Sequence, residues 1–195
     1  KVLDRDNTSG IIDRGGTILG TSRVSPLHVE NGPQRVFAEF DRLGLEALVV
    51  LGGEGTLSVA SKLFDMGLPL VGIPKTIDND LFGTVITFGF DTAVSIATEA
   101  IDRLHSTARS HEGVMVVEVM GRHAGWIALE AGISGAADVI LLPEIPFDLD
   151  KVSDHIMGGE LRGQRYAIVV AAEGAKPVGG RAISRGSGEV GRQDV

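Results

Sequence analysis

The sequence contains no cysteine, which excludes disulfide bonds, thiolate zinc sites and thiol nucleophiles. No apolar run approaches the length of a membrane span, and the first residues lack the apolar core of a signal peptide. Positive charge is also in deficit: the formal net charge is -8, which argues against passive attraction to nucleic acid or to an anionic membrane. We therefore expect a cytoplasmic protein with neither nucleic acid nor membrane as a partner.

Glycine, by contrast, is abundant, with 27 residues in a chain of 195. The glycines gather at the ends of apolar runs, a placement typical of nucleotide-binding α/β folds. Residues 179–195 are rich in glycine and arginine and lack apolar periodicity, so we expect a loop or frayed end there. The remainder, residues 1–178, is predicted to be one α/β region that belongs to a longer domain, since the chain begins with Lys1 rather than Met.

Short apolar runs alternate with helical patterns along the chain. Strands are predicted at residues 47–51, 68–73, 114–119, 139–142 and 166–171, and helices at residues 57–66, 91–104, 124–133 and 149–161. The first strand is apolar throughout, which predicts burial on both faces, and Asp91 is predicted to cap the helix that follows it. The alternation predicts a doubly wound, mostly parallel sheet with helices on both faces, incomplete at both ends. Ligands bind such sheets beyond the carboxyl ends of the strands.

The segment of residues 72–80, G-I-P-K-T-I-D-N-D, carries the most chemistry. Pro74 is predicted to take the backbone out of regular pairing, which leaves an extended loop. On such a loop Asp78 and Asp80 point roughly the same way, with a lysine and a threonine hydroxyl just before them. This combination could deprotonate a hydroxyl and bind phosphate at once. A solvated acidic turn is the alternative for these residues taken alone.

A second loop, G-G-E-G-T at residues 52–56, follows the first predicted strand. Its glycines would let backbone N–H groups approach phosphates at the start of a helix. A glutamate cannot bind phosphate directly, so Glu54 is expected to hold Mg²⁺, through water. The alternative is a tight turn with a solvent-facing glutamate.

Two further loops follow later strands. Arg122 is placed where a helix is predicted to begin, an unfavourable position for a cation unless a ligand anion neutralises it; a surface charge paired with a nearby acid is the alternative. His123 could be structural or catalytic, and Trp126 is predicted to be core. Glu173 suits hydrogen bonding to sugar hydroxyls or helix capping. Together, the loops at successive strand ends indicate phosphoryl transfer.

These loops resemble the 6-phosphofructokinase family, in its bacterial and actinobacterial form. The matching blocks are G-G-T-x-L-G-T-x-R at residues 15–23, G-G-E-G-T at 52–56, P-K-T-I-D-N-D at 74–80, M-G-R-H-A-G-W-I-A at 120–128, P-E-I-P-F at 143–147 and A-E-G at 172–174. The resemblance implies an allosteric, homotetrameric glycolytic kinase. Such an enzyme transfers a phosphoryl group from ATP, with Mg²⁺, to the 1-hydroxyl of fructose 6-phosphate and releases fructose 1,6-bisphosphate.

The resemblance also implies roles for individual residues. Asp78 matches the family's general base and Asp80 its companion near the metal, while Arg122 is placed to offset charge on the transferred phosphoryl group, which Thr76 also touches. The positions that match sugar-phosphate contacts are Thr76, Ile77, Asp78, Met120, Gly121, Arg122 and Glu173. The positions that match nucleotide contacts are Arg23, Val24, Gly53, Glu54, Gly55 and Thr56, of which Glu54 takes the magnesium-linked position.

Two residues bear on the phosphoryl donor. The family tends to have glycine at the position of Gly55 in enzymes that use ATP and aspartate in those that use pyrophosphate, because a carboxylate there would repel the α-phosphate of a nucleotide. Lys75 points the other way, since lysine before T-I-D-N-D is common in pyrophosphate users. We predict ATP, with a pyrophosphate-dependent phosphofructokinase as the alternative. Another kinase with a G-G-E-G-T loop, such as an NAD or diacylglycerol kinase, would not be expected to carry the other blocks.

Departures from the family pattern predict that this sequence is a central fragment with impaired activity by itself. The family's glycine-rich nucleotide turn would precede residue 1, and its H-x-Q-R-G-G block would follow residue 195. Gly113 stands where the family usually has an arginine that reaches a neighbouring subunit's sugar phosphate, a loss expected to weaken substrate affinity. A non-catalytic, sugar-phosphate-binding regulatory fragment is therefore a further alternative.

Overall fold

The computed structural model describes residues 2–22, 24–161 and 163–181, which form two compact units that divide after Leu45. The first unit contains α1 (Arg5–Thr8), the 3₁₀-helix η1 (Pro26–His28) and α2 (Gly32–Arg42). Apolar spacing predicted none of these helices. The proposed division at residue 178 stays a prediction, and residues 182–195 of the predicted loop or frayed end lie outside the described residues.

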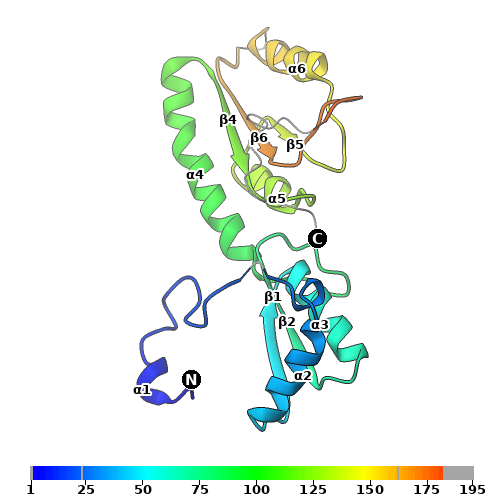
Figure 1. Cartoon of the computed structure of the whole chain (residues 1–195). Helices are drawn as coiled ribbons and strands as arrows, with labels where there is room; N and C mark the ends of the chain where they lie inside the picture. The colour runs from blue at the N-terminus through cyan, green and yellow to red at the C-terminus, as the bar shows by residue number, and fades with distance from the viewer. Residues whose placement is uncertain (1, 23, 162, 182–195) are drawn as a thin grey trace. The chain divides into compact units, whose positions relative to one another are not determined.

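The second unit contains two parallel sheets, each of three strands (Figure 1). The first sheet has the order β1-β2-β3, with β1 (Leu48–Gly52), β2 (Leu70–Thr76) and β3 (Phe88–Gly89). The second has the order β4-β6-β5, with β4 (Val114–Val119), β5 (Val139–Leu141) and β6 (Ala167–Ala172). The helices between them are α3 (Glu54–Asp65), α4 (Phe90–His111), α5 (Trp126–Ser134) and α6 (Leu149–Leu161). The predicted α/β class with parallel, helix-covered sheets is confirmed.

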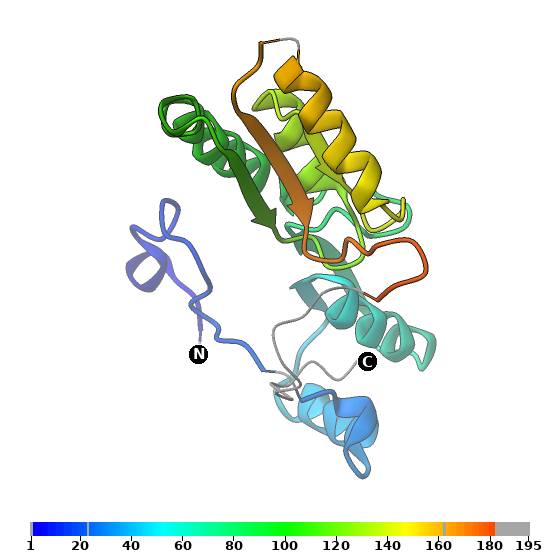
Figure 2. The same cartoon turned by 90° about the horizontal axis from the view of Figure 1, so that it is seen from above.

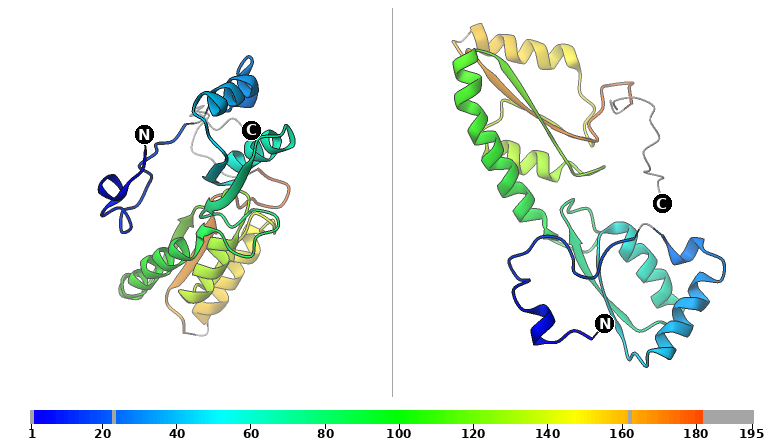
Figure 3. Two further views of the ribbon diagram at one scale, coloured as in Figure 1. Left: turned by 90° about the horizontal axis from the view of Figure 1, so that it is seen from below. Right: turned by 60° about the vertical axis from the view of Figure 1, so that its left-hand side comes forward.

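The core of the second sheet lies around its central strand, β6. Ile168 and Val170 of β6 are fully buried, and they pack against Ile101 of α4 and Ala128 of α5. Figure 2 shows the parallel strands β4 and β6 side by side, and Figure 3 shows α5 and α6 on opposite sides of these strands. Because both of its faces are covered, β6 reads as an uninterrupted apolar run. This burial fixes the position of Glu173, the residue that follows β6.

The first sheet is covered on one face only within its unit. Val50 pairs with Gly72 on the face against α3, where Leu57 leaves no free space beside Gly72. On the opposite face Val49 and Val71 are 62% and 63% exposed. The prediction that this first strand is buried on both faces is therefore wrong for this chain. Side chains alternate along a strand, so a single covering helix buries only every second residue.

The strand β2 runs straight through Pro74, so the predicted break in pairing at this proline is wrong. Pro74 pairs with Gly52, the last residue of β1, and the two residues after it pair with β3. A proline lacks only its own N–H group. Pro74 lies at the end of the β1–β2 pairing, so its missing N–H group does not break the hydrogen bonds between the earlier residues of the two strands.

The ends of two helices differ from the predictions. The N-cap of α4 is Gly89, with φ 111°, and Asp91 instead lies in the first turn of the helix. Trp126 is the first residue of α5 and is 46% exposed, so its predicted core position is wrong; the following residue, Ile127, is buried in its place. Among the described residues, no helix combines the length and apolar character needed to cross a membrane.

Candidate active site

The predicted catalytic loop leaves the end of β2 in a bend rather than as an extended segment. Asn79 has a left-handed backbone conformation, with φ 52°, which turns the chain between the two aspartates. The N–H group of Asp78 donates a hydrogen bond to the Thr76 hydroxyl oxygen at 3.2 Å. The extended geometry predicted for Asp78 and Asp80 is thus wrong, although both side chains remain partly buried.

Asp78 lies in an environment that makes it a better base than an ordinary aspartate. Burial raises the pKa of its carboxyl group, and the negative charge of Asp80 raises this pKa further. The charge of Arg122 and a hydrogen bond with Thr76 lower the pKa in part, and Glu173 raises it. Residues that follow β2, β4 and β6 therefore act on one carboxyl group. A carboxylate with a raised pKa accepts a proton more readily, as general-base catalysis requires.

Asp80 supplies a buried oxygen atom without a hydrogen-bond partner. Its Oδ1 is the one buried side-chain atom in this situation among the described residues. An unsatisfied acceptor of this kind costs free energy unless a ligand or ion completes it. No cluster of three or more histidine or acidic side chains in the described part of the chain could hold a metal ion alone. This arrangement fits Mg²⁺, which proteins usually bind through one or two carboxylates together with substrate phosphates.

The G-G-E-G-T loop lies directly against the catalytic loop. α3 begins at Glu54, three residues before the predicted start at residue 57, with Gly53 as its N-cap. A Cβ atom at Gly53 would lie 3.2 Å from the Cβ of Thr76, so the absence of a side chain permits this close approach. A Cβ atom at Gly55, by contrast, would meet nothing within 4 Å. No hydrogen bond to a described side chain caps this helix start, and the first N–H groups of a helix favour an anion.

The loop that carries Arg122 is held by a carboxylate from the neighbouring strand. Glu173 Oε1 accepts hydrogen bonds from the N–H groups of Arg122 and Gly121, at 2.8 and 3.3 Å. α5 begins only at Trp126, so the prediction that Arg122 lies at a helix start is wrong. Arg122 instead has a positive φ of 54° in the preceding turn. Six residues separate the end of β4 at Val119 from the start of α5 at Trp126, and Arg122 is the third of them.

The guanidinium of Arg122 connects the two sheets electrostatically. Its Nη1 lies 3.8 Å from Glu54 Oε2, and the side chains of Arg122 and Glu54 are 39% and 64% exposed. This pair corresponds to the predicted alternative, a charge paired with a nearby acid. An exposed pair of this length stabilises the fold weakly. Arg122 can therefore exchange its glutamate partner for a ligand anion.

Glu144 is a site residue to which the sequence assigned no role. Its Oε1 accepts a hydrogen bond from the N–H group of Gly125, the N-cap of α5, at 2.8 Å. A Cβ atom at Gly125 would lie 2.7 Å from the other carboxylate oxygen of Glu144, so the two segments are in direct contact. The P-E-I-P-F match at residues 143–147 was the sole sequence signal for this segment.

The remaining predicted residues fall into three groups. Lys75, Met120, His123 and Thr56 are exposed, and Ile77 is partly buried. Val24 is exposed and belongs to the first unit. Arg23, predicted to contact the nucleotide, lies outside the described residues. The roles of these residues in binding stay predictions.

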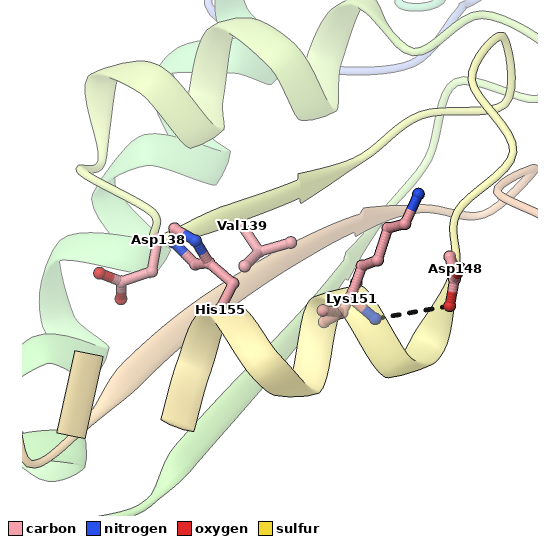
Figure 4. Close-up of a pocket in the computed structure, with 6 residues that line it drawn as sticks. Asp138, Val139, Asp148, Lys151 and His155 are labelled. Atoms are coloured by element: carbon pink, nitrogen blue, oxygen red, sulfur yellow. Dashed lines mark hydrogen bonds between the residues drawn. The ribbon is translucent and has the colours of Figure 1, made fainter. Parts of the chain in front are cut away.

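A shallow hollow between β5 and α6 lies away from these loops (Figure 4). Its lining residues are Asp138, Val139, Asp148, Lys151, Val152 and His155. Asp138 Oδ2 accepts a hydrogen bond from the N–H group of Ile168 at 2.8 Å, and Asp148 Oδ1 accepts one from the N–H group of Asp150 at 3.0 Å. These acids stabilise a strand and a helix start, so the hollow is not the candidate active site.

Charged groups lie beyond the carboxyl ends of parallel strands, where α/β proteins of this class bind their ligands. The chain belongs to the phosphofructokinase family, since the family model described as "Phosphofructokinase" matches residues 1–192. The predicted family membership is confirmed.

Relatives with two different donor names are similar to this chain. It is 56% identical over 178 residues to "ATP-dependent 6-phosphofructokinase 3" of Streptomyces coelicolor, which covers 91% of this chain and 52% of the relative. It is 57% identical over 176 residues to "Pyrophosphate--fructose 6-phosphate 1-phosphotransferase" of the same organism, covering 90% of this chain and 51% of the relative. The chain thus spans about half the length of the curated relatives it matches.

Solved structures show the same fold. The phosphofructokinase of Pichia pastoris in the T-state matches with a TM-score of 0.84 at 32% identity, over 93% of this chain and 22% of that chain. A pyrophosphate-dependent phosphofructokinase from Marinobacter aquaeolei matches with a TM-score of 0.68 at 32% identity, over 83% of this chain and 44% of that chain.

Proposed function

We propose that the protein is part of a 6-phosphofructokinase that transfers the γ-phosphoryl group of ATP to the 1-hydroxyl of fructose 6-phosphate. In this reaction the sugar oxygen attacks the γ-phosphorus, the hydroxyl proton passes to the Asp78 carboxylate, and the bond between the γ-phosphorus and the ADP oxygen breaks. The products are fructose 1,6-bisphosphate and ADP. The observation that carries the proposal is the convergence of Arg122 and Glu173 on Asp78 from the ends of other strands, in a bent loop where burial and the charge of Asp80 raise the pKa of Asp78.

Charge neutralisation at the transferred phosphoryl group is the second part of the proposal. Arg122 would leave Glu54 and contact the phosphoryl oxygens, while the Thr76 hydroxyl contacts both sugar and phosphoryl group. Mg²⁺ supplies further positive charge at the phosphates. Asp80, with its unsatisfied oxygen, and Glu54, through water, would hold the metal ion.

The sugar phosphate would bind at the loop that follows β4. We propose that Met120, Gly121 and Arg122 contact it, together with Ile77 from the catalytic loop. Glu173 would bind the sugar hydroxyls with the same carboxylate that holds the loop backbone. The hydrogen bonds of Glu173 to the loop backbone support this proposal, because they hold its carboxylate beside the residues proposed to bind the sugar phosphate.

The donor is proposed to be ATP because Gly55 leaves space at the start of α3. Arg23, Val24 and the segment from Gly53 to Thr56 are proposed to contact the nucleotide. A pyrophosphate-dependent activity is the alternative that a specific observation favours: relatives with that name are as similar to this chain as those named for ATP, and Lys75 is common among pyrophosphate users.

The donor assignment is tested with the full-length protein, fructose 6-phosphate, Mg²⁺ and either ATP or pyrophosphate in a coupled assay. We expect turnover with ATP and a fall of about a hundredfold in kcat/KM for ATP in Gly55→Asp, because the added carboxylate repels the α-phosphate. Ser61→Asp adds the same charge farther along α3 and serves as the control, with unchanged kinetics. Turnover with pyrophosphate alone would replace the ATP assignment by the alternative.

Three properties of the whole protein accompany this proposal: a homotetramer, allosteric regulation and a cytoplasmic location. A non-catalytic, sugar-phosphate-binding fragment is the remaining alternative, which the glycine at position 113 favours. Sedimentation of the full-length protein tests the tetramer. Binding of fructose 6-phosphate without turnover, with either donor, would favour the regulatory alternative.

A further inference from the structure

Thr87 is a buried polar residue that the proposed reaction does not use. With 3% of its surface exposed, it is the one polar residue as buried as the apolar core in the described part of the chain. Buried hydroxyl groups are costly unless their hydrogen-bonding capacity is used. The partners of Thr87 therefore indicate what its burial accomplishes.

All three polar groups of Thr87 are used, and two of them hold the catalytic loop. Its hydroxyl donates to the carbonyl oxygen of Thr76 at 2.8 Å, at the point where β2 ends. Its N–H group donates to Oδ1 of Asn79 at 2.9 Å. Its carbonyl oxygen accepts from the N–H group of Phe90, the first residue of α4, at 3.3 Å. Thr87 thus connects Thr76 and Asn79 of the loop to the start of a long helix.

Asn79 is the residue whose conformation places the two aspartates. It lies between Asp78 and Asp80 and has a positive φ of 52°, which asparagine tolerates better than most residues. A positive φ persists when the surrounding contacts hold it in place. The hydrogen bond from Thr87 to the Asn79 side chain supplies such a contact.

Backbone pairing at this point is too short to hold the loop alone. β3 consists of two residues, and it pairs with β2 only at Lys75 and Thr76. Ile77 packs close to the backbone of β3, since a Cβ atom at Gly89 would lie 3.4 Å from it. No hydrogen bond within a strand ladder reaches Asp78 or Asp80.

We propose that Thr87 is a positioning residue: through Asn79 and the Thr76 carbonyl, it holds Asp78 and Asp80 in the geometry required for catalysis. The kinetic part of this inference rests on the proposed function, because it needs Asp78 to act on a substrate. The structural part, a hydrogen-bonded latch on the loop of residues 76–80, stands independently of the reaction.

The test compares Thr87→Val, which removes the hydroxyl but keeps the branched shape, with Thr87→Ser, which keeps the hydroxyl. Measured on the full-length protein with fructose 6-phosphate and ATP, kcat should fall about ten- to a hundredfold in Thr87→Val, since displacement of a catalytic group by about 1 Å can cost that much. KM should change less than about threefold, because most of the proposed sugar contacts come from outside this loop, from residues 120–122 and Glu173. Thr87→Ser should keep most of the activity.

The control is Thr98→Val. Thr98 also donates its hydroxyl to a backbone carbonyl at 2.8 Å, that of Val94, but within α4 and away from the loop. Loss of the Thr98 hydroxyl in Thr98→Val should leave kcat unchanged. Equal losses of kcat in Thr87→Val and Thr87→Ser, or no loss in either, would overturn the positioning role.

If Thr87→Val fails to fold, Asn79→Gly tests the same role, because glycine accepts the positive φ but lacks the hydrogen-bond acceptor. This variant should show the same loss of kcat with KM maintained.

Hydrogen exchange separates a failure of the latch from a failure of the proposed function. The amide of Thr87 should exchange at least about tenfold faster in Asn79→Gly than in the wild type, because its acceptor is lost. Unchanged exchange overturns the latch, whatever the protein's activity. If the wild type transfers no phosphoryl group from ATP or pyrophosphate while exchange behaves as expected, the proposed function fails and the latch stands.

Discussion

Carboxylates on the two sides of the candidate site are used in opposite ways. After β2, burial raises the pKa of Asp78, and among the described residues Asp80 keeps a buried oxygen without a hydrogen-bond partner. After β6 and β5, Glu173 and Glu144 accept hydrogen bonds from backbone N–H groups of the loop between β4 and α5. The first pair is left available for a proton or an ion, whereas the second pair builds the loop that presents Arg122.

Acidic residues of one site thus differ in whether their carboxylate oxygens already accept hydrogen bonds from backbone N–H groups. A carboxylate that accepts hydrogen bonds from backbone N–H groups holds the structure of the loop that carries them. A partly buried carboxylate beside another acid is kept ready to bind a proton. The expected effects of substitution on activity and on stability should therefore separate the two pairs.

Replacing Asp78 should have the largest effect. In the full-length protein, Asp78→Asn should lower kcat by about a thousandfold, the middle of the range for loss of a general base, with little change in nucleotide binding. Steady-state kinetics and calorimetric titration of ATP measure the two quantities. Asp102→Asn, an exposed acid on α4, is the matched control and should behave like the wild type. Undiminished turnover in Asp78→Asn would contradict the proposal that Asp78 and Asp80 serve the reaction while Glu173 and Glu144 hold the loop.

Replacing Glu144 should affect stability rather than turnover. Glu144→Ala leaves the N-cap amide of Gly125 without its acceptor, which should lower the free energy of unfolding by about 1 kcal/mol. Glu144→Gln keeps an acceptor oxygen and should lose much less. Urea unfolding measures the difference, and kcat with saturating substrates should stay within about twofold. A large loss of kcat with unchanged stability would contradict a structural role.

The smallest expected effect is a pH dependence of stability. Because the pKa of Asp78 is raised in the folded state, folding favours its protonated form. The resulting stability is fully present below the ordinary aspartate pKa of about 3.9 and is lost as the pH rises through the raised value. Asp78→Asn removes this loss, so the variant should gain stability relative to the wild type across that interval. Urea unfolding at several pH values tests it; a difference independent of pH would contradict the raised pKa.

The sequence predicted the candidate site's main parts because each follows the carboxyl end of a predicted strand, in the first sheet for Asp78 and in the second for Arg122 and Glu173. Asp78, Arg122 and Glu173 each follow an apolar run, and the fold gathers them without further information. The local geometry of the loops was harder to predict from the sequence. Asn79 bends the loop because its side chain meets Thr87, a residue 8 positions away, and Glu144 reaches Gly125 across 19 positions. Neither contact has a signature in spacing or apolar pattern.

Burial was predicted less well than chemistry. Apolar character alone indicated that residues 47–51 are covered on both faces and that Trp126 is core, yet Val49 and Trp126 are exposed. The apolar character of a side chain indicates that its burial is favourable, but it does not indicate which helix or strand will cover it. Pro74 and Asp91 show the same limit for backbone features, since pairing and capping depend on where the neighbouring strand ends and where the helix begins.

The pair formed by Arg122 and Glu54 has a consequence for ionic strength. Solvent reaches both groups at their 3.8 Å separation, so the pair contributes roughly 0–1 kcal/mol and weakens further in salt. In the proposed reaction a phosphoryl group, which carries more negative charge than a single carboxylate, would attract the same guanidinium more strongly. Arg122 would then act as an exchangeable counter-ion: glutamate holds it loosely between turnovers, and raising the salt concentration would disturb the resting pair before it disturbed the one formed with substrate.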